Sequence, residues 1–255
     1  MNNFFNINKL IALTILVFIF NKPTYSQNES TTLIFKEKRN ELNTRYNLVL
    51  TSTLSRWKEL TTPNVDENRI QDVDYISTEN YTKREVYKDL NNEFVYSNYN
   101  ILNHNFYVKD KIEPLKWTIL DSTETILNYN CQIAKTKFRG RTYLASFTKE
   151  IASSNGPWKF QGLPGLILKV ISINDLYEKF EIECVEIRTN SNNNIEETFK
   201  KFINKYDKKF ITWRGFVLEI DTFLKKHIQN IKSSGESSDS GSYAIKFELK
   251  HYKEI

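Results

Sequence analysis

The chain has 255 residues, with 36 Lys and Arg against 31 Asp and Glu, a formal net charge of +5 and 40% hydrophobic residues. It is long enough for one sizeable domain, and charges of both signs are interspersed. Lys-rich pairs such as Lys200-Lys201 and Lys208-Lys209 are typical of solvated helix faces, so there is no basic stripe of the kind that binds nucleic acid. We therefore expect no nucleic-acid partner.

The first 26 residues have the pattern of a secretory signal peptide. Lys9 precedes the uncharged run Leu10–Phe20, Asn21-Lys22-Pro23 ends it, and small residues lead to a cleavage site after Ser26. A retained anchor is the alternative, but this run would span only about 16 Å against about 30 Å of hydrocarbon. We predict a single mature domain, residues 27–255, with a net charge of about +3. It would be periplasmic or secreted and would not span a membrane.

Alternation of apolar and polar residues predicts a series of β-strands from residue 45 onward. The expected strands are 45–51, 84–90, 93–99, 105–109, 116–120, 129–138, 141–147, 166–173 and 178–187. Asn91-Asn92, Arg139-Gly140 and Asn174-Asp175 are the expected hairpin turns, and 61–72 is an expected loop. In the last strand Phe180, Ile182 and Cys184 alternate with Glu181 and Glu183. This pattern predicts an antiparallel sheet with one wet face.

The C-terminal part changes to helical periodicity. Residues 195–206 predict one helix, and an apolar stripe from Phe216 to Ile231 predicts a second one that closes over the apolar face of the sheet. The polar segment Ser233–Ser242 is expected to be mobile, and Tyr243–Leu249 returns to strand alternation.

Two cysteines remain for a disulfide, Cys131 and Cys184. In an oxidising envelope they can pair, and closing the 52-residue loop between them would stabilise the chain by roughly 4 kcal/mol. The alternative is two buried thiols on separate strands.

No catalytic or metal-binding constellation is present in the sequence. His104 and His227 are isolated: the first is expected in a solvent-exposed turn, and the second packs on the helical stripe. Neither cysteine lies in a metal-binding motif, so we expect no metal and no cofactor. Glu181 and Glu183 share a strand face, as charges on a wet face do.

One segment concentrates backbone turns. Gly156, Pro157, Gly162, Pro164 and Gly165 fall within ten residues. The large groups between them are Trp158, Lys159, Phe160 and Leu163. We expect a structural corner in which Trp158 and Phe160 act as plugs. The functional alternative is the rigid rim of a ligand or partner groove formed by these four residues, with Lys159 as the one displayed charge.

These residues also carry a family resemblance. Tyr143–Ile151, Gly156-Pro-Trp-Lys-Phe160 and Gly162-Leu-Pro-Gly-Leu-Ile167 resemble the GLPGLI family of bacterial envelope proteins. The likeness runs over roughly Tyr46–Ile187, and Ser146 departs from it where an aromatic residue is common. Members typically carry a signal peptide, and they have no defined catalytic residues to carry over.

The order of elements is similar to the curved half-barrels of periplasmic lipoprotein carriers, an analogy of fold only. We therefore predict an α+β, mainly β fold: a curved, half-barrel-like antiparallel sheet with C-terminal helices packed on one face. The leading hypothesis is a non-enzymatic envelope protein that binds an apolar or lipidated ligand, or an outer-membrane protein partner. The alternatives are a hydrolase that assembles Lys159, His104 or a carboxylate, and a structural accessory to outer-membrane transporter assembly that pairs through an exposed strand edge.

Overall fold

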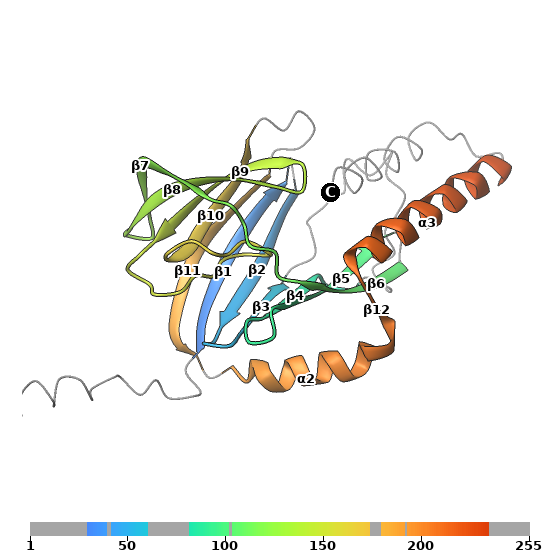
Figure 1. Ribbon diagram of the computed structural model, residues 1–255, viewed down its shortest axis with the longest axis horizontal. Coiled ribbons are helices and arrows are strands. Elements are labelled where there is room, and N and C mark those ends of the chain that lie inside the picture. Colours follow the sequence, from blue (N-terminus) through green and yellow to red (C-terminus); the bar gives the residue numbers. More distant parts are fainter. Residues whose placement is uncertain are drawn as a thin grey trace, which may run out of the picture.

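The computed structural model describes residues 30–39, 42–60, 82–101, 104–173, 180–191 and 193–234 (Figure 1). The predicted signal peptide, the loop at 61–72, the Asn174-Asp175 turn and the strand at 243–249 lie outside these residues. Among the helices of the described part, none combines the length and the apolar composition that crossing a bilayer requires.

The described strands form one twelve-stranded sheet. They are β1 Ser30–Arg39, β2 Leu42–Leu50, β3 Leu54–Glu59, β4 Glu85–Asp89, β5 Phe94–Ile101, β6 His104–Lys111, β7 Thr118–Ile126, β8 Tyr129–Phe138, β9 Arg141–Thr148, β10 Leu166–Ile173, β11 Phe180–Ser191 and β12 Phe210–Ile211. Their order is β12-β6-β5-β4-β3-β2-β1-β11-β10-β9-β8-β7, and every pair is antiparallel except β12 with β6. We call β1, β2 and β7–β11 the curved half, and β3–β6 with β12 the wing (Figure 1).

The predicted class, mainly β with a curved sheet and C-terminal helices, is confirmed. The hairpins at Asn91-Asn92 and Arg139-Gly140 are also confirmed, and the second has φ of 49° at Arg139 and 74° at Gly140. Strands β1, β3 and β12 were not expected. In β1 the buried charge of Glu37 interrupts the inward series of Leu33 and Phe35. The strand expected at 116–120 is β7, which begins at 118 and runs to 126.

The concave face of the curved half carries the main core. Alternation sends Phe35 and Tyr46 inward. Trp57, on the adjoining wing strand β3, stacks on Tyr46 with ring centres 4.6 Å apart and meets Phe35 edge-on at 5.1 Å. The segment Asn155–Gly165, which we call the plug segment, folds into this same core. Its Phe160 and Leu163 are 0% and 1% exposed. Each such burial contributes roughly 1.5–3 kcal/mol, so the plug segment stabilises the curvature that it fills.

Glycine is required at two positions of the plug segment. A Cβ on Gly165, where φ is 157°, would lie 2.1 Å from the Thr148 carbonyl oxygen, and a Cβ on Gly156 would lie 2.6 Å from the Cβ of Ile167. The backbone therefore runs against β9 and β10 at distances that no side chain permits. The plug segment is therefore a closely packed corner at these two glycines.

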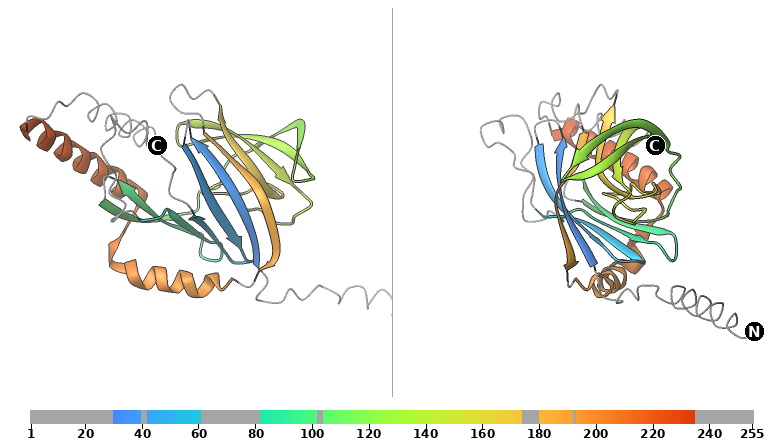
Figure 2. Two further views of the ribbon diagram at one scale, coloured as in Figure 1. Left: turned by 180° about the vertical axis from the view of Figure 1, so that it is seen from behind. Right: turned by 90° about the vertical axis from the view of Figure 1, so that its left-hand side faces the viewer.

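The two helices, α2 Ile195–Tyr206 and α3 Trp213–Ser234, pack on opposite faces of the wing (Figure 2). In α2, Phe202 packs with Tyr87 and Tyr107 on one face. In α3, Phe216 packs with Phe106 on the other face. The expectation of helices on one face is corrected, because the chain between them pairs as β12 with the edge strand β6 and so passes around the sheet edge.

The second helix also ends later than expected. Ser233 and Ser234 belong to α3, and the Ser233 hydroxyl donates to the Asn230 carbonyl at 2.8 Å. A side chain that satisfies a carbonyl of the last turn prolongs the helix into the serine-rich segment. The rest of the predicted mobile segment, residues 235–242, lies outside the described residues.

Candidate functional site

A cavity of about 100 Å³ lies where the curved half, the wing, the plug segment and α3 meet. Its lining consists of six aromatic residues, four arginines and one glutamate. These are Glu37, Arg39, Trp57, Arg84, Tyr99, Arg139, Arg141, Tyr143, Trp158, Phe180 and Trp213. We call this cavity the junction pocket. A pocket with aromatic walls and several cations is suited to an amphipathic ligand.

The β1 side of the junction pocket holds its one carboxylate. Glu37 is 5% exposed, and its Oε1 lies 3.2 Å from Arg39 Nε and 3.9 Å from an Arg84 guanidinium nitrogen. The Arg39 guanidinium also lies 5.0 Å from the centre of the Phe180 ring. Because a buried carboxylate needs paired charges, Glu37 organises these two arginines and is already engaged by them.

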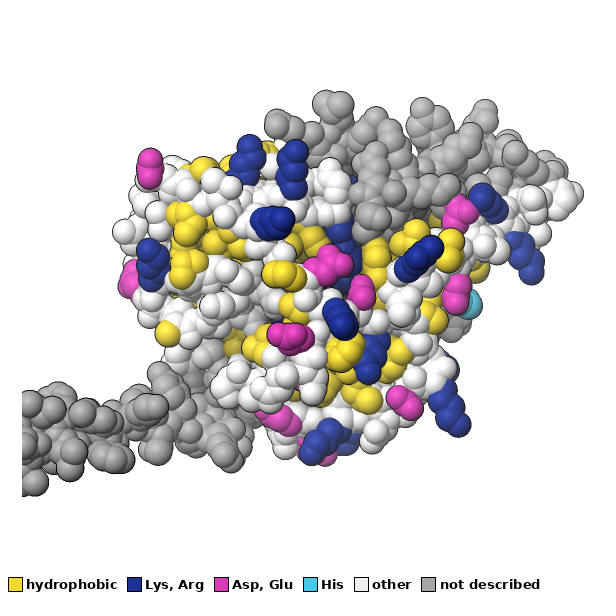
Figure 3. Space-filling view, viewed as in Figure 1, with side chains coloured by type: hydrophobic (Ala, Val, Ile, Leu, Met, Phe, Trp, Pro, Cys, Tyr) yellow, Lys and Arg dark blue, Asp and Glu magenta, His cyan; other side chains and the backbone are white. Residues whose placement is uncertain are grey.

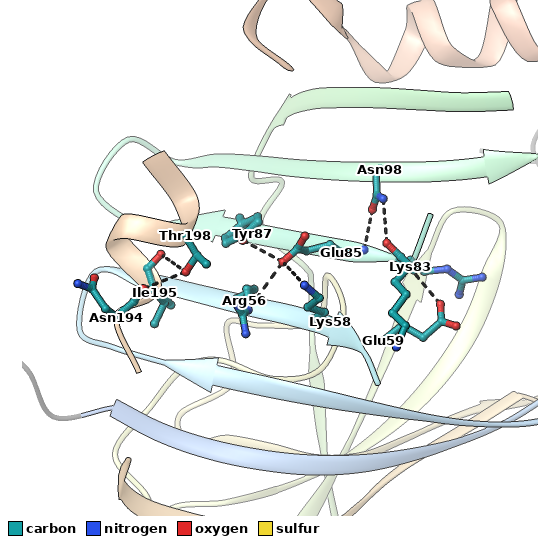
Figure 4. Close-up of polar contacts among 11 residues, drawn as sticks. Arg56, Lys58, Glu59, Lys83, Glu85, Tyr87, Asn98, Asn194, Ile195 and Thr198 are labelled. Carbon is teal, nitrogen blue, oxygen red and sulfur yellow. Dashed lines mark hydrogen bonds and ion pairs between the residues drawn. The ribbon is translucent and has the colours of Figure 1, made fainter. Parts of the chain in front are cut away.

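The backbone around Arg84 is held by two side chains (Figure 4). A carboxylate oxygen of Glu59 accepts from the Arg84 N–H at 3.2 Å. The Asn98 amide accepts from the Glu85 N–H at 2.6 Å and donates to the Lys83 carbonyl at 2.9 Å. On the opposite face, Glu85 accepts from the Tyr87 hydroxyl at 2.9 Å. These bonds define where β4 begins, and they place Arg84 at the pocket wall.

The opposite wall is built by the β8–β9 turn and the first residue of α3. Arg139 holds a left-handed backbone conformation, and its guanidinium carbon lies 3.6 Å from the centre of the Trp213 ring and 5.0 Å from that of Phe138. Stacking on Trp is the strongest form of cation–π contact. The hairpin turn and the C-terminal helix are therefore joined across the pocket.

Lys159 lies directly behind this wall and is only 8% exposed. Its Nζ lies 4.7 Å from the ring centre of Trp213, 5.8 Å from that of Tyr99 and 6.0 Å from that of Trp158. Burial lowers the pKa of Lys159, and Arg139 lowers it further, although Tyr99 opposes both. Burial alone would raise the pKa of Tyr99, but the charges of Lys159 and Arg139 outweigh it and bring that pKa below its ordinary value.

The four residues suggested by the sequence as a groove divide into two pairs. Trp158 lines the junction pocket, and Lys159 borders it, but as a buried group rather than as the displayed charge of the groove alternative. Phe160 and Leu163 lie wholly inside the core, which is the structural role favoured for them. Lys159 is buried because the aromatic rings around it replace water at its ammonium.

Ten other lining residues were not proposed as site residues from the sequence, and six of them are Arg39, Arg84, Arg139, Arg141, Tyr99 and Trp213. A weak signal was available for one of them, since Arg39 has the inward parity of Leu33 and Phe35 on β1. The others come from strand ends, a turn and a helix start. Only tertiary structure brings such positions together.

The other polar candidates have structural partners. His104 is exposed and packs on Phe106 and Phe223, with ring centres at 4.7 and 5.1 Å. Lys169 binds Glu183 at 2.8 Å and Glu181 at 3.4 Å on the wet face of the sheet. Neither His104 nor this glutamate pair lines the junction pocket or contacts Lys159. In the ranges that the structure describes, no three His, Cys, Asp or Glu side chains gather as a metal site.

A second buried lysine, Lys88, holds the plug segment that forms part of the pocket wall. Lys88 on β4 is 1% exposed, and its Nζ donates to the Gly156 carbonyl at 2.9 Å and to the Phe160 carbonyl at 3.1 Å. On the other side, Trp117 Nε1 donates to the Gln161 carbonyl at 2.9 Å. Burial lowers the pKa of Lys88 to about 7. Side chains far away in the sequence thus bind the carbonyls of the plug segment, and they fix where Trp158 and Lys159 lie.

The two cysteines are free, buried thiols on β8 and β11. Burial raises the pKa of Cys131 to about 11 and that of Cys184 to about 12. The structure thus has the second of the two arrangements considered, buried thiols on separate strands. A disulfide under oxidising conditions stays a prediction.

Fold and site together define a curved-sheet protein with an arginine- and aromatic-lined pocket. Residues 135–169, from β8 into β10, match a family described as "Protein of unknown function (Porph_ging)". This match contains the β8–β9 turn and the whole plug segment. No curated protein matches the sequence.

Several solved structures are distantly similar. Two structures of PNGF-II, in different space groups, align with a TM-score of 0.44 and 16% and 13% identity, over 67% and 66% of this chain and 29% and 30% of theirs. MucB in complex with MucA(peri) aligns with a TM-score of 0.35 and 9% identity, over 67% of this chain and 54% of that one. The chain thus spans less than a third of PNGF-II and about half of MucB. These values are too low to transfer a function from either protein.

Proposed function

We propose that this protein is a non-enzymatic binding protein of the cell envelope, and that its ligand enters the junction pocket. The observation that carries the proposal is the lining itself, in which every residue is aromatic or charged. Aromatic walls offer apolar contact area at low entropic cost, and the cations orient a polar group. Periplasmic or secreted localisation and membership of the GLPGLI family belong to the same proposal. The signal-like N-terminus and the Gly162–Ile167 hexapeptide support them.

The lining favours binding over the hydrolase alternative. Glu37 is the only carboxylate among the residues of the junction pocket, and it pairs with Arg39 and Arg84. A general base needs a free lone pair within reach of a substrate proton, and arginine cannot accept one. The arginine-rich lining therefore favours recognition over hydrolysis.

The pocket volume narrows the earlier expectation of an apolar or lipidated ligand. Plug-segment side chains fill the concave face, and the junction pocket keeps an open volume of about 100 Å³. This volume is below the 300–1,000 Å³ that is typical of pockets for drug-sized ligands. We propose that one end of an amphipathic molecule occupies the pocket while the rest of the molecule lies outside it.

Intrinsic fluorescence tests the proposal, because three of the four tryptophans, Trp57, Trp158 and Trp213, line the pocket. We expect aromatic probes, the neutral N-phenyl-1-naphthylamine and the anionic 1-anilino-8-naphthalenesulfonate, to quench this fluorescence saturably at a 1:1 ratio. Trp213→Ala should abolish saturable binding of both probes. Leu218→Ala is the matched control, since Leu218 is 62% exposed on the same helix. If neither probe binds the wild type, or if both variants bind alike, the pocket is not the ligand site.

A protein partner is a second candidate, favoured by an edge of the sheet that no further described strand covers. Strand β7 is the last strand in the order, and Ile119 on it is 45% exposed, with Leu127 just beyond it 40% exposed. An exposed edge with apolar side chains is suited to strand addition by a partner. Crosslinking through Cys placed at Thr123 should capture an envelope protein in wild-type cells, and Ile119→Lys should reduce the yield. If the yield is unchanged by Ile119→Lys, the edge is not the docking surface.

A further inference from the structure

Two cations meet at the junction pocket without a counter-ion. Arg139 and Lys159 both lie against the Trp213 ring, at 3.6 and 4.7 Å from its centre. No carboxylate among the described residues forms an ion pair with either of them. Asp110 and Glu113 line a small neighbouring cavity together with both cations, and Asp110 raises the pKa of Lys159, but no ion pair of theirs with the two cations is found among the described residues. Like charges held together in a partly dry site repel each other, so an anion bound directly between them would be stabilising.

Hydrogen-bond donors at the same wall also lack acceptors. The buried hydroxyl of Tyr99 and the buried Nε1 of Trp213 have no hydrogen-bond partner of normal geometry among the described residues. Tyr99 Oη remains without such a bond even though Lys159 and Ser97 lie near it and lower its pKa. A buried donor without an acceptor costs folding free energy. This wall holds two such donors beside the two cations.

The remaining polar groups of the pocket do not supply the missing charge. Glu37 is engaged by Arg39 and Arg84 on the β1 side. Gln161 borders Arg139 and Lys159 from below and has a buried, unpartnered Oε1, but a neutral amide cannot balance two full charges.

We infer that the junction pocket recognises an anionic head group, a carboxylate or a phosphate, attached to an aromatic or apolar body, with Arg139 as the contacting cation and Lys159 as the supporting charge. This inference rests on the proposed function and names the ligand class of that site. Arginine offers paired N–H groups that match the oxygens of either head group. The rings of Trp158, Tyr143 and Phe180 would contact the body that carries the anion.

Paired probes of the same shape and different charge test the inference. The anionic 1-anilino-8-naphthalenesulfonate should bind at least about tenfold more tightly than the neutral N-phenyl-1-naphthylamine. Arg139→Asn removes the charge and keeps a residue that tolerates the left-handed backbone, and Lys159→Gln removes the second charge. Each should weaken the anionic probe about tenfold or more and leave the neutral probe within twofold, whereas Arg139→Lys should recover part of the loss.

Matched controls separate charge from folding. Lys109 lies over Phe94 and Tyr96 on the opposite face of the wing, at 4.6 and 5.4 Å, so Lys109→Gln removes an equivalent cation–π lysine far from the pocket. It should leave both probes unaffected. Thermal melting of each variant checks that the pocket is intact. For a variant that melts early, binding to the neutral probe reports the pocket independently.

The outcomes distinguish the inference from the proposed function beneath it. Equal affinity for the two probes, or equal losses in Lys159→Gln and Lys109→Gln, would leave the binding pocket in place and overturn its anion selectivity. Failure of both probes would overturn both. Competition by benzoate and by phenyl phosphate, with benzyl alcohol as the neutral control, tells which head group is preferred. Displacement by benzyl alcohol as effective as that by either anion would contradict the inference.

Discussion

The apolar surfaces of the two halves of the sheet are covered in different ways. The curved half bends around its own plug segment, so that its concave face is filled from within by Phe160 and Leu163. The wing stays more open and is covered from outside, by α2 on one face and α3 on the other (Figure 2). Because the plug segment fills the concave face, the junction pocket between the two halves is small, about 100 Å³. A more open cavity of about 970 Å³ lies beyond it, between residues 113–120 and 135–139.

That junction is also where the charge is arranged. On the face shown in Figure 3, Lys and Arg side chains are interspersed with Asp and Glu rather than gathered by sign. The junction pocket departs from this balance, with four arginines and a nearby lysine against one glutamate. The comparison of the halves thus places the junction pocket and the unbalanced charge at the same position.

The largest loss of stability should come from a cavity in the core of the curved half rather than from one in the core under α3. Phe160→Ala opens a cavity in the curved half and should destabilise the protein by about 3–5 kcal/mol, with the loss spread over the sheet. Phe216→Ala, equally buried under α3, should mainly loosen α3 and β6. Chemical denaturation with hydrogen exchange checks this. Exchange that rises over the curved half in Phe216→Ala would show that the two cores are one cooperative unit.

Gly165→Val should follow in size. Its side chain has no room beside the Thr148 carbonyl, and we expect a loss of about 3 kcal/mol or more in the free energy of unfolding. Gly215→Ala is the control, because a Cβ there approaches Thr212 Oγ1 no closer than 3.4 Å and helix propensity favours alanine. Thermal melting should show a clear decrease for the first variant and none for the second. Equal melting of Gly165→Val and wild type would contradict our account of the plug segment.

The pH dependence of the free energy of unfolding tests the role of Lys88, which joins the wing to the plug segment. Lys88 releases its proton near pH 7 in the folded state but near pH 10.5 when unfolded. The unfolded chain therefore binds more protons between these values, and stability should rise with pH across this window by on the order of 1 kcal/mol per pH unit at most. Lys159 adds in the same direction. Below pH 7 Lys88 contributes no slope.

Lys88→Met tests the assignment of that slope. The variant should flatten the rise above pH 7, and at pH 9 it should be about 1–3 kcal/mol less stable than the wild type, because the Gly156 and Phe160 carbonyls lose their donor. Urea denaturation at pH 6, 7.5 and 9 gives both quantities. An unchanged slope would assign the pH dependence to other groups.

The smallest effect concerns the cysteines. Raised pKa values and burial should make Cys131 and Cys184 unreactive towards iodoacetamide at pH 8 in the folded protein and reactive in urea. An intact mass two hydrogens lighter, with no labelling in urea before reduction, would instead show that the predicted disulfide forms. The same mass reports whether cleavage occurs after Ser26.

Local pattern was sufficient for most elements of the fold. Helix α2 begins and ends where periodicity placed it, and Asn194 caps it by accepting from the Glu197 N–H. Strand prediction failed where the alternation of apolar and polar residues is broken. At Glu37 a charge points inward and pairs with Arg39 and Arg84. The plug segment was recognisable because its glycines and large apolar residues follow a local steric logic.

The sequence by itself determined most of the elements, the class of fold and the buried role of Phe160, because strand alternation, helical spacing and glycine sterics act over a few residues. Only the tertiary structure decided which face each helix covers and that Arg39, Arg84, Arg139, Lys159 and Trp213 share one site. Those positions come from strand ends, a turn and a helix start that are far apart in the chain. Their meeting depends on the curvature of a twelve-stranded sheet and on a two-residue strand at its edge, and no local pattern encodes either.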